Sequence, residues 1–146
     1  MSKSNSWETD ILKLLFTNLS GALIGDASGI QPSAGSGSLY ISLHSADPGE
    51  AGDQTTSEAT FTSYARVGVG RNAAAWTVSG NSVTNAAVIT FPACTGSSTT
   101  VTYFGIGTAS SGAGKLLYSG AVSPSIAVTS GITALIPISG ISVTED

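Results

Sequence analysis

The sequence has little charge and almost no cysteine. Charged residues make up only 10% of its 146 residues, against about a quarter in ordinary soluble domains. Its five cations are scattered and the formal net charge is −4, so no basic patch is available to neutralise a phosphate backbone. We therefore expect no nucleic acid partner. The single cysteine, Cys94, cannot close an intramolecular disulfide, so burial and hydrogen bonds have to stabilise the fold, together with any association between chains.

Long hydrophobic runs are also missing. The most apolar stretches, Ile11 to Phe16 and Ala134 to Ile138, are too short to span a bilayer. Met1 to Asp10 contains two acids and one lysine, unlike the basic start of a signal peptide. We expect a soluble, unexported chain without a membrane partner.

One segment has the spacing of a helix. Apolar residues recur every three or four positions between Trp7 and Leu23, at Leu12, Leu15, Phe16, Leu19 and Leu23. Ser6 is positioned to cap its start, and Gly21 or Gly25 to end it. We expect a helical arm at 1–25 that docks on its own domain or, alternatively, on a neighbouring chain.

After the arm, the pattern changes to a glycine- and serine-rich linker at 26–38 and then to strands at 39–146. Leu39, Ile41 and Leu43 alternate with polar residues, which predicts a half-buried strand whose His44 is exposed. Gly80-Asn81 is typical of a hairpin turn. The other predicted strands are Ala59 to Val69, Ala75 to Ser79, Val83 to Phe91, Thr100 to Gly107, Lys115 to Ser119, Ser125 to Thr129, Ile132 to Pro137 and Ile141 to Thr144.

Many short strands without crossover helices predict a mainly β fold, an antiparallel β-sandwich or jelly roll with one N-terminal helix. The chain length is typical of a single domain. Glycines within the strands, such as Gly105 and Gly107, indicate bulges or tight backbone approaches.

Catalytic motifs are absent from the pattern. A serine triad needs a histidine, and His44 is the only one in the chain; no serine lies in a G-x-S-x-G elbow. Cys94 follows a strand end and is expected to be buried and inert. Gly68 to Ala73 resembles a dinucleotide fingerprint, but a strand follows instead of a helix. We expect no enzyme activity and no cofactor.

The loop from Asp47 to Asp53 gathers three carboxylates. It lacks the spacing of an EF-hand. A solvated acidic turn is the favoured interpretation and no metal is expected, with a calcium site as the alternative.

The residue types that dominate protein interfaces concentrate at Tyr64, Arg66, Arg71 and Trp76. Trp76 has the alternative of filling the core, and Arg66 that of pairing with Glu58 or Asp47. The predicted interface residues are Trp7, Leu12, Leu15 and Phe16 in the arm and Tyr64, Arg66 and Arg71 in the body.

Three segments resemble small virion proteins of tailed bacteriophages: Leu39 to Arg71, Ile89 to Gly96 and Tyr103 to Gly120. Similar sequences are often labelled tail fibre proteins, and the chain is also similar in size and strand content to head cement proteins. The resemblance implies a virion structural role, in a protein made in the host cytoplasm.

Because the sequence has no fibre-like repeat, we favour a head decoration or cement protein on the capsid exterior. It would bridge major capsid proteins and associate with itself as a dimer or trimer. The alternative is a tail-associated or tail fibre protein that binds a host receptor, for example a glycan, through exposed aromatics at Tyr40, Tyr103 and Tyr118.

Overall fold

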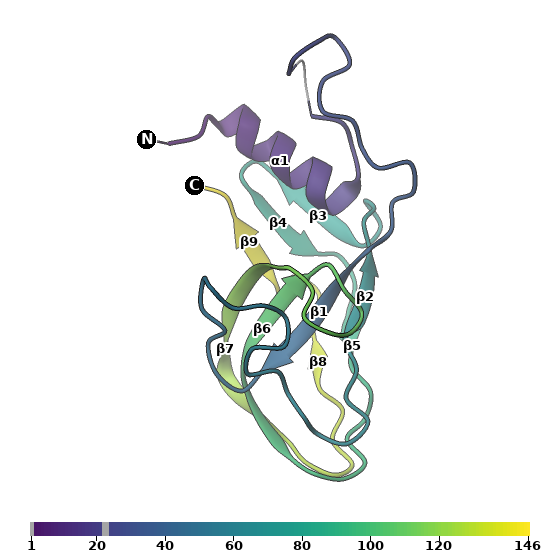
Figure 1. The fold of residues 1–146 in the computed structure, drawn as a ribbon, viewed down its shortest axis with the longest axis vertical. Coiled ribbons are helices and arrows are strands. Elements are labelled where there is room, and N and C mark those ends of the chain that lie inside the picture. The colour runs from purple at the N-terminus through teal and green to yellow at the C-terminus, as the bar shows by residue number, and fades with distance from the viewer. Residues whose placement is uncertain (1, 22–23) are drawn as a thin grey trace. The chain divides into compact units, whose positions relative to one another are not determined.

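The computed structural model describes residues 2–21 and 24–146; Leu23, predicted to extend the helix, lies outside them. The fold is mainly β with one N-terminal helix and antiparallel sheets that do not close, which confirms the predicted class (Figure 1). Its elements are α1 (Asn5–Thr17), β1 (Ser38–His44), β2 (Val67–Gly70), β3 (Trp76–Ser79), β4 (Ser82–Asn85), β5 (Ile89–Thr90), β6 (Thr99–Gly107), β7 (Leu116–Val128), β8 (Leu135–Ile136) and β9 (Ser142–Thr144).

The chain forms two compact units that interleave along the sequence. Unit 1 comprises residues 1–38, 70–88 and 136–146, and unit 2 comprises 39–69 and 89–135. Unit 1 holds α1 and a three-stranded sheet in the order β3-β4-β9. The four-stranded sheet, in the order β2-β1-β6-β7, lies almost entirely in unit 2, and β5 pairs with β8. The predicted division into an arm, a linker and a β domain stays a prediction.

The helix is shorter than predicted and its caps differ. It begins at Asn5 with Ser4 in the N-cap position, so the prediction that Ser6 caps it is wrong. It ends at Thr17 because Asn18 turns into the left-handed region, at φ 54°. Asparagine tolerates this conformation nearly as well as glycine. The predicted ends at Gly21 and Gly25 are therefore wrong, and Leu19 lies beyond the helix, exposed.

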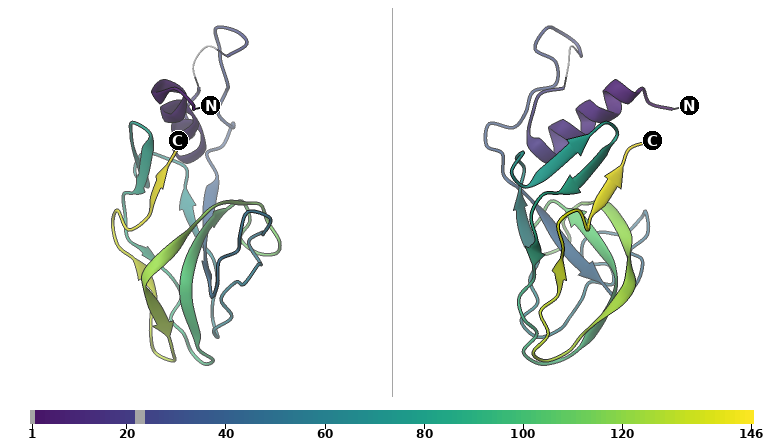
Figure 2. Two further views of the ribbon diagram at one scale, coloured as in Figure 1. Left: turned by 90° about the vertical axis from the view of Figure 1, so that its left-hand side faces the viewer. Right: turned by 180° about the vertical axis from the view of Figure 1, so that it is seen from behind.

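One stripe of α1 packs on the β3–β4 hairpin of the same chain (Figure 2). Leu12 and Phe16 lie one turn apart and are fully buried. The ring of Phe16 meets that of Trp76 edge to face, with 4.8 Å between centroids. Trp76 is buried as well, which confirms the core alternative for it.

Arg71 joins the helix end to the segment that follows it. Its guanidinium donates from Nη2 to the carbonyl of Leu14 and from Nε to that of Leu15, both over 2.6 Å. These carbonyls belong to the last turn of α1. Carbonyls in the last turn of a helix have no hydrogen-bond partners within the helix, and they lie at the negative end of its dipole. Nη1 donates to Ser33 Oγ over 3.0 Å. The predicted linker is thus hydrogen-bonded to Arg71 within unit 1.

The sheet of unit 1 has the predicted hairpin. In β3 and β4, Ser79 lies opposite Ser82, and Gly80 at the turn has φ 60°, as a two-residue turn requires. β9 adds to the other side of β4, with Val143 opposite Val83.

In unit 2, β1 lies centrally in its sheet and is buried on both faces. Ile41 lies opposite Ile106 on one face, whereas Ser42 and His44 on the other face are fully buried too. The expectation of a half-buried strand with an exposed His44 is therefore wrong. The physical reason is that the segment 45–57 folds back over this face, where His44 Nδ1 bonds the carbonyl of Thr56.

The observed strand bounds differ from the predicted ones where alternating apolar and polar residues are not paired with a neighbouring strand. Most of the predicted strand Ala59 to Val69 is irregular, because Ser63 takes φ 78° and Tyr64 closes a turn onto Phe61; only β2 remains. Conversely, the strands predicted at Lys115 to Ser119 and Ser125 to Thr129 form one strand, β7. The register of β7 against β6 shifts twice. The segment from Val83 to Phe91 divides into β4 and β5.

Candidate functional site

Ser42 and His44 form the one pairing that resembles a catalytic dyad. His44 Nδ1 lies 2.8 Å from the carbonyl oxygen of Thr56, which can only accept, so Nδ1 carries the proton and donates. Nε2 is then the acceptor, and the hydroxyl of Ser42 donates to it over 2.8 Å. Both side chains are completely buried. Gly105 closes this space: a Cβ there would lie 2.6 Å from Ser42 Oγ and 2.7 Å from His44 Nε2. No substrate can reach the serine, so the pair is structural.

The burial of His44 predicts a loss of stability in mild acid. Burial lowers its pKa below the usual 6.5, outweighing the hydrogen bond to Thr56 and the charge of Glu58. Between pH 6.5 and the lower folded pKa, the unfolded chain binds a proton that the folded chain excludes. As the pH is lowered through this range, the free energy of unfolding should decrease by up to about 1.4 kcal/mol per pH unit.

Urea unfolding between pH 7.5 and 5 measures this effect. His44 is the only histidine, so His44→Gln should be less stable at pH 7.5 and nearly independent of pH in the upper part of that range. An equal slope in both proteins would mean that His44 does not cause the acid sensitivity.

A second buried network surrounds Arg66. Its Nε and Nη2 donate to the two carboxylate oxygens of Glu58 over 2.6 and 2.8 Å, and the Arg66 side chain is only 2% exposed. Nη1 also donates to the carbonyl of Ala109, and Nη2 to that of Gly112. The hydrogen bond to Glu58 raises the pKa of Arg66. The ion pair confirms the alternative of internal pairing with Glu58.

Tyr64 belongs to the same network. Its hydroxyl donates to Glu58 Oε1 over 2.9 Å and accepts from the amide of Leu43 over 3.0 Å. Burial raises the pKa of this phenol, which stays protonated. The network thus attaches the irregular segment 58–66 to the central strand β1.

The interface residues predicted in the arm and body have varied environments. In unit 1, Leu12 and Phe16 are buried against the hairpin, whereas Trp7 and Leu15 are half-buried. The body residues Tyr64, Arg66 and Arg71 are engaged in the internal contacts described above. A role of these residues in binding another chain stays a prediction.

The acidic loop does not collect its carboxylates around one point. Asp47 Oδ1 accepts from the amide of Gly49, and Asp53 Oδ1 accepts from the hydroxyl and the amide of Thr55. The hydroxyl of Thr55 lowers the pKa of Asp53. Among the residues that the structure describes, no three His, Cys, Asp or Glu side chains group as a metal site requires.

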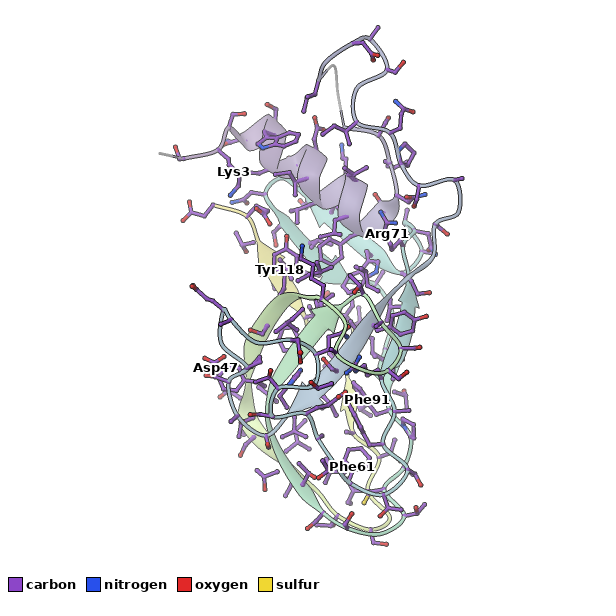
Figure 3. All side chains as sticks on the ribbon, in the orientation of Figure 1. Lys3, Asp47, Phe61, Arg71, Phe91 and Tyr118 are labelled. Carbon is purple, nitrogen blue, oxygen red and sulfur yellow. The ribbon has the colours of Figure 1, made fainter. Side chains whose placement is uncertain are left out.

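A shallow groove of about 360 Å³ lies between this loop and β7. Figure 3 labels one lining residue from each side, Asp47 of the loop and Tyr118 of β7. The loop contributes Asp47, Gly49, Glu50 and Gly52, and the strand contributes the run 116–119. Within residues 2–21 and 24–146, no hydrogen bond or ion pair occupies the Glu50 carboxylate. The groove therefore combines negative charge with the edge of a sheet.

The three tyrosines considered for receptor contact do not form a platform. All are half-buried, so the expectation that they are exposed is wrong. Tyr40 and Tyr103 share the face of His44, whereas Tyr118 lies opposite Ile106 on the other face.

Sequence reasoning missed Gln54, which is fully buried. Its Oε1 accepts from the amide of Ala109, and the side chain covers Gly107, where a Cβ would lie 2.1 Å from Gln54 Cδ. The strand glycines were the available signal: Gly105 and Gly107 mark tight approaches, as predicted. Cys94 is buried, also as predicted, and its thiol reaches the carbonyl of Ser97 over 3.1 Å.

No helix among the described residues is both long and apolar enough to cross a membrane.

In a comparison with family models, residues 2–144 match the family described as podophage GP4 fiber I protein gp80. No curated protein matches the chain. The match is to a fibre of the virion, so the favoured assignment to the head is not supported, and the tail fibre alternative agrees better with it. The chain belongs to the podophage GP4 fiber I protein gp80 family, as a non-enzymatic structural protein of the phage virion.

Proposed function

We propose that the chain acts in host attachment, as a fibre subunit that binds a receptor on the bacterial surface without changing it chemically. The observation that carries this proposal is the match to a fibre family over residues 2–144. The sealed Ser42–His44 pair is consistent with a protein that acts by binding alone.

The surface we propose for this contact is one face of the sheet in unit 1. Thr77 lies opposite Thr84, and Thr84 lies opposite Ser142. One step along, Ser79 lies opposite Ser82, and Ser82 lies opposite Thr144. Because opposite residues share a face, six hydroxyl side chains form two rows. Four of them are exposed and two are half-buried.

This hydroxyl face has the chemistry of an uncharged receptor. Each hydroxyl both donates and accepts a hydrogen bond, which suits a polyhydroxylated host glycan. Ser82 Oγ and Ser142 Oγ lie 3.4 Å apart, so neighbouring hydroxyls are close enough to share one ligand group. No ion has to be desolvated when such a face is covered. Trp76 and Val83 hold the opposite face against α1, which keeps the rows in place.

Adsorption to susceptible host cells tests the attachment function. The purified chain should bind these cells and, added before infection, should lower the fraction of phage that adsorbs. Labelled antibody on intact virions should mark a fibre. A chain that neither binds cells nor competes with phage, with antibody label over the head, would exclude a role in attachment.

The proposed face is tested by replacing its exposed threonines and one partner with alanine. Adsorption should drop at least tenfold in the triple variant Thr77→Ala, Thr84→Ala and Thr144→Ala. The matched control replaces exposed threonines of unit 2, at Thr100, Thr129 and Thr133. Equal adsorption of both variants would place the receptor contact elsewhere on the chain.

A further inference from the structure

The hydroxyl face of unit 1 depends on a very short strand. β9 spans Ser142–Thr144 and lies at the end of the order β3-β4-β9, beside β4 alone. It nevertheless supplies two of the six hydroxyl side chains, those of Ser142 and Thr144. Short strand pairs are only marginally stable in water, so this ladder by itself does not fix β9. Contacts outside the ladder have to set its position.

Asn85, the last residue of β4, lies opposite the point where the chain enters β9. Thr84 pairs with Ser142, so the next position of the register sets Asn85 opposite Ile141. Asn85 Oδ1 accepts from the amide of Ile141 over 2.8 Å. The main-chain carbonyl of Asn85 accepts from the amide of Ser139 over 2.9 Å. Asn85 therefore extends the attachment of this segment beyond the last backbone pair of the ladder.

The side-chain amide of Asn85 uses its two hydrogens as well. Nδ2 donates to the carbonyls of Pro137 and Ala87, each over 2.8 Å. Asn85 thus holds alternate residues of the turn before β9, at 137, 139 and 141. This turn contains Ser139 at φ 57°, a conformation that serine keeps only where its surroundings enforce it. Because Asn85 is fully buried, water cannot replace these hydrogen bonds.

We infer that Asn85 is a positioning residue of the proposed receptor face, which holds β9 in register without touching the receptor. Asn85 pairs with Trp76 in β3, and opposite residues share a face, so its side chain lies behind the hydroxyl rows. At the other end of β9, Asn81 Nδ2 donates to the carbonyl of Glu145 over 3.1 Å. Asn81 is exposed, so water can replace that contact. The inference rests on the proposed function, because the role it assigns to Asn85 is in receptor binding.

Hydrogen exchange followed by NMR tests the positioning without a receptor. In Asn85→Ala, the amides of Val143 and Glu145 should exchange roughly tenfold faster or more, because β9 opens locally. Amides of the β3–β4 hairpin should change less. Asn85→Asp has the same shape but cannot donate from its carboxylate, so it should behave like Asn85→Ala. An equal acceleration in β9 and in the hairpin would contradict the inference, since Asn85 would then stabilise unit 1 as a whole.

Adsorption to susceptible host cells tests the consequence for the receptor. Asn85→Ala should adsorb roughly tenfold less than the wild-type chain, because two of the hydroxyls lose their fixed places. The matched control is Leu12→Ala, which removes a fully buried side chain of α1 in the same unit. At a temperature where both variants are folded, Leu12→Ala should adsorb like the wild-type chain.

A disulfide between β4 and β9 should rescue the variant. Val83 and Val143 are directly opposite each other, and Cα atoms of such pairs are about 4.5–5.5 Å apart, a span that a disulfide can bridge. Asn85→Ala with Val83→Cys and Val143→Cys should regain adsorption when oxidised and lose it when reduced. The same low adsorption in both redox states would contradict a role of Asn85 through β9.

The outcomes separate this inference from the proposed function. If the wild-type chain does not bind cells, or the variant Thr77→Ala, Thr84→Ala and Thr144→Ala binds unchanged, the proposed face is excluded, and with it the role of Asn85 in receptor binding. If Asn85→Ala releases β9 in the exchange experiment but adsorbs like the wild-type chain, only the inference is overturned. The receptor would then not need β9 in its place.

Discussion

Replacing Trp76 with alanine should lower the free energy of unfolding of unit 1 by about 3–5 kcal/mol, the usual range for a large buried aromatic. The side chain is only 1% exposed, and it packs edge to face on Phe16. Its removal leaves a cavity between β3 and the buried stripe of α1. Urea titration followed by far-UV circular dichroism should show an earlier transition with loss of the helix signal.

Two companion variants separate packing from other causes. Trp7, the other tryptophan, is half-buried, so Trp7→Ala should have a clearly smaller effect. The indole nitrogen of Trp76 is buried without a hydrogen-bond partner among the residues described. Trp76→Phe removes this unsatisfied donor while keeping a ring, and it should lose less stability than alanine does. Equal losses for Trp7→Ala and Trp76→Ala would argue against the packing of α1 on this hairpin.

Replacing Glu58 with alanine should destabilise unit 2 by about 3–5 kcal/mol, because it leaves the guanidinium of Arg66 buried without its counter-ion. The Arg66 side chain is 2% exposed and that of Glu58 is 17% exposed, so water cannot fully replace the carboxylate. Tyr64 loses the acceptor of its hydroxyl at the same time. Chemical denaturation at pH 7.5 measures the loss.

A double variant tests whether the uncompensated charge of Arg66 causes the loss of stability in Glu58→Ala. Replacing both members by apolar residues, with Glu58→Leu and Arg66→Met, removes the uncompensated charge as well as the pair. The double variant should therefore be more stable than Glu58→Ala alone, although the carbonyls of Ala109 and Gly112 lose their donors. A double variant less stable than the single one would show that Arg66 contributes mainly through those carbonyls.

The sequence predicted elements whose local signals agree with their packing. The hairpin at Gly80-Asn81 forms because its turn chemistry and the flanking alternation require the same register. The stripe at Leu12 and Phe16 is buried as its spacing predicts. Alternation failed at Ala59 to Arg66, where apolar side chains turn inward from an irregular backbone. Nothing local distinguishes this from a strand.

The candidate sites were harder to predict because they depend on long-range contacts. His44 is buried by Thr56, and Arg66 reaches carbonyls more than forty positions away. The pairing of Arg66 with Glu58 was among the alternatives, since the two are near in sequence. The position of β7 at the end of its sheet could not be foreseen, because strand order is a property of the whole sheet.

The interleaving of the two units has a consequence for synthesis on the ribosome. Unit 2 needs residues as late as 135, and unit 1 needs both its first segment and the last eleven residues, 136–146. Neither unit can therefore complete its contacts while the chain is still being elongated through β7. Nascent and prematurely terminated chains should expose apolar strands and depend on chaperones, and neither unit can be expressed alone as one uninterrupted stretch of the gene.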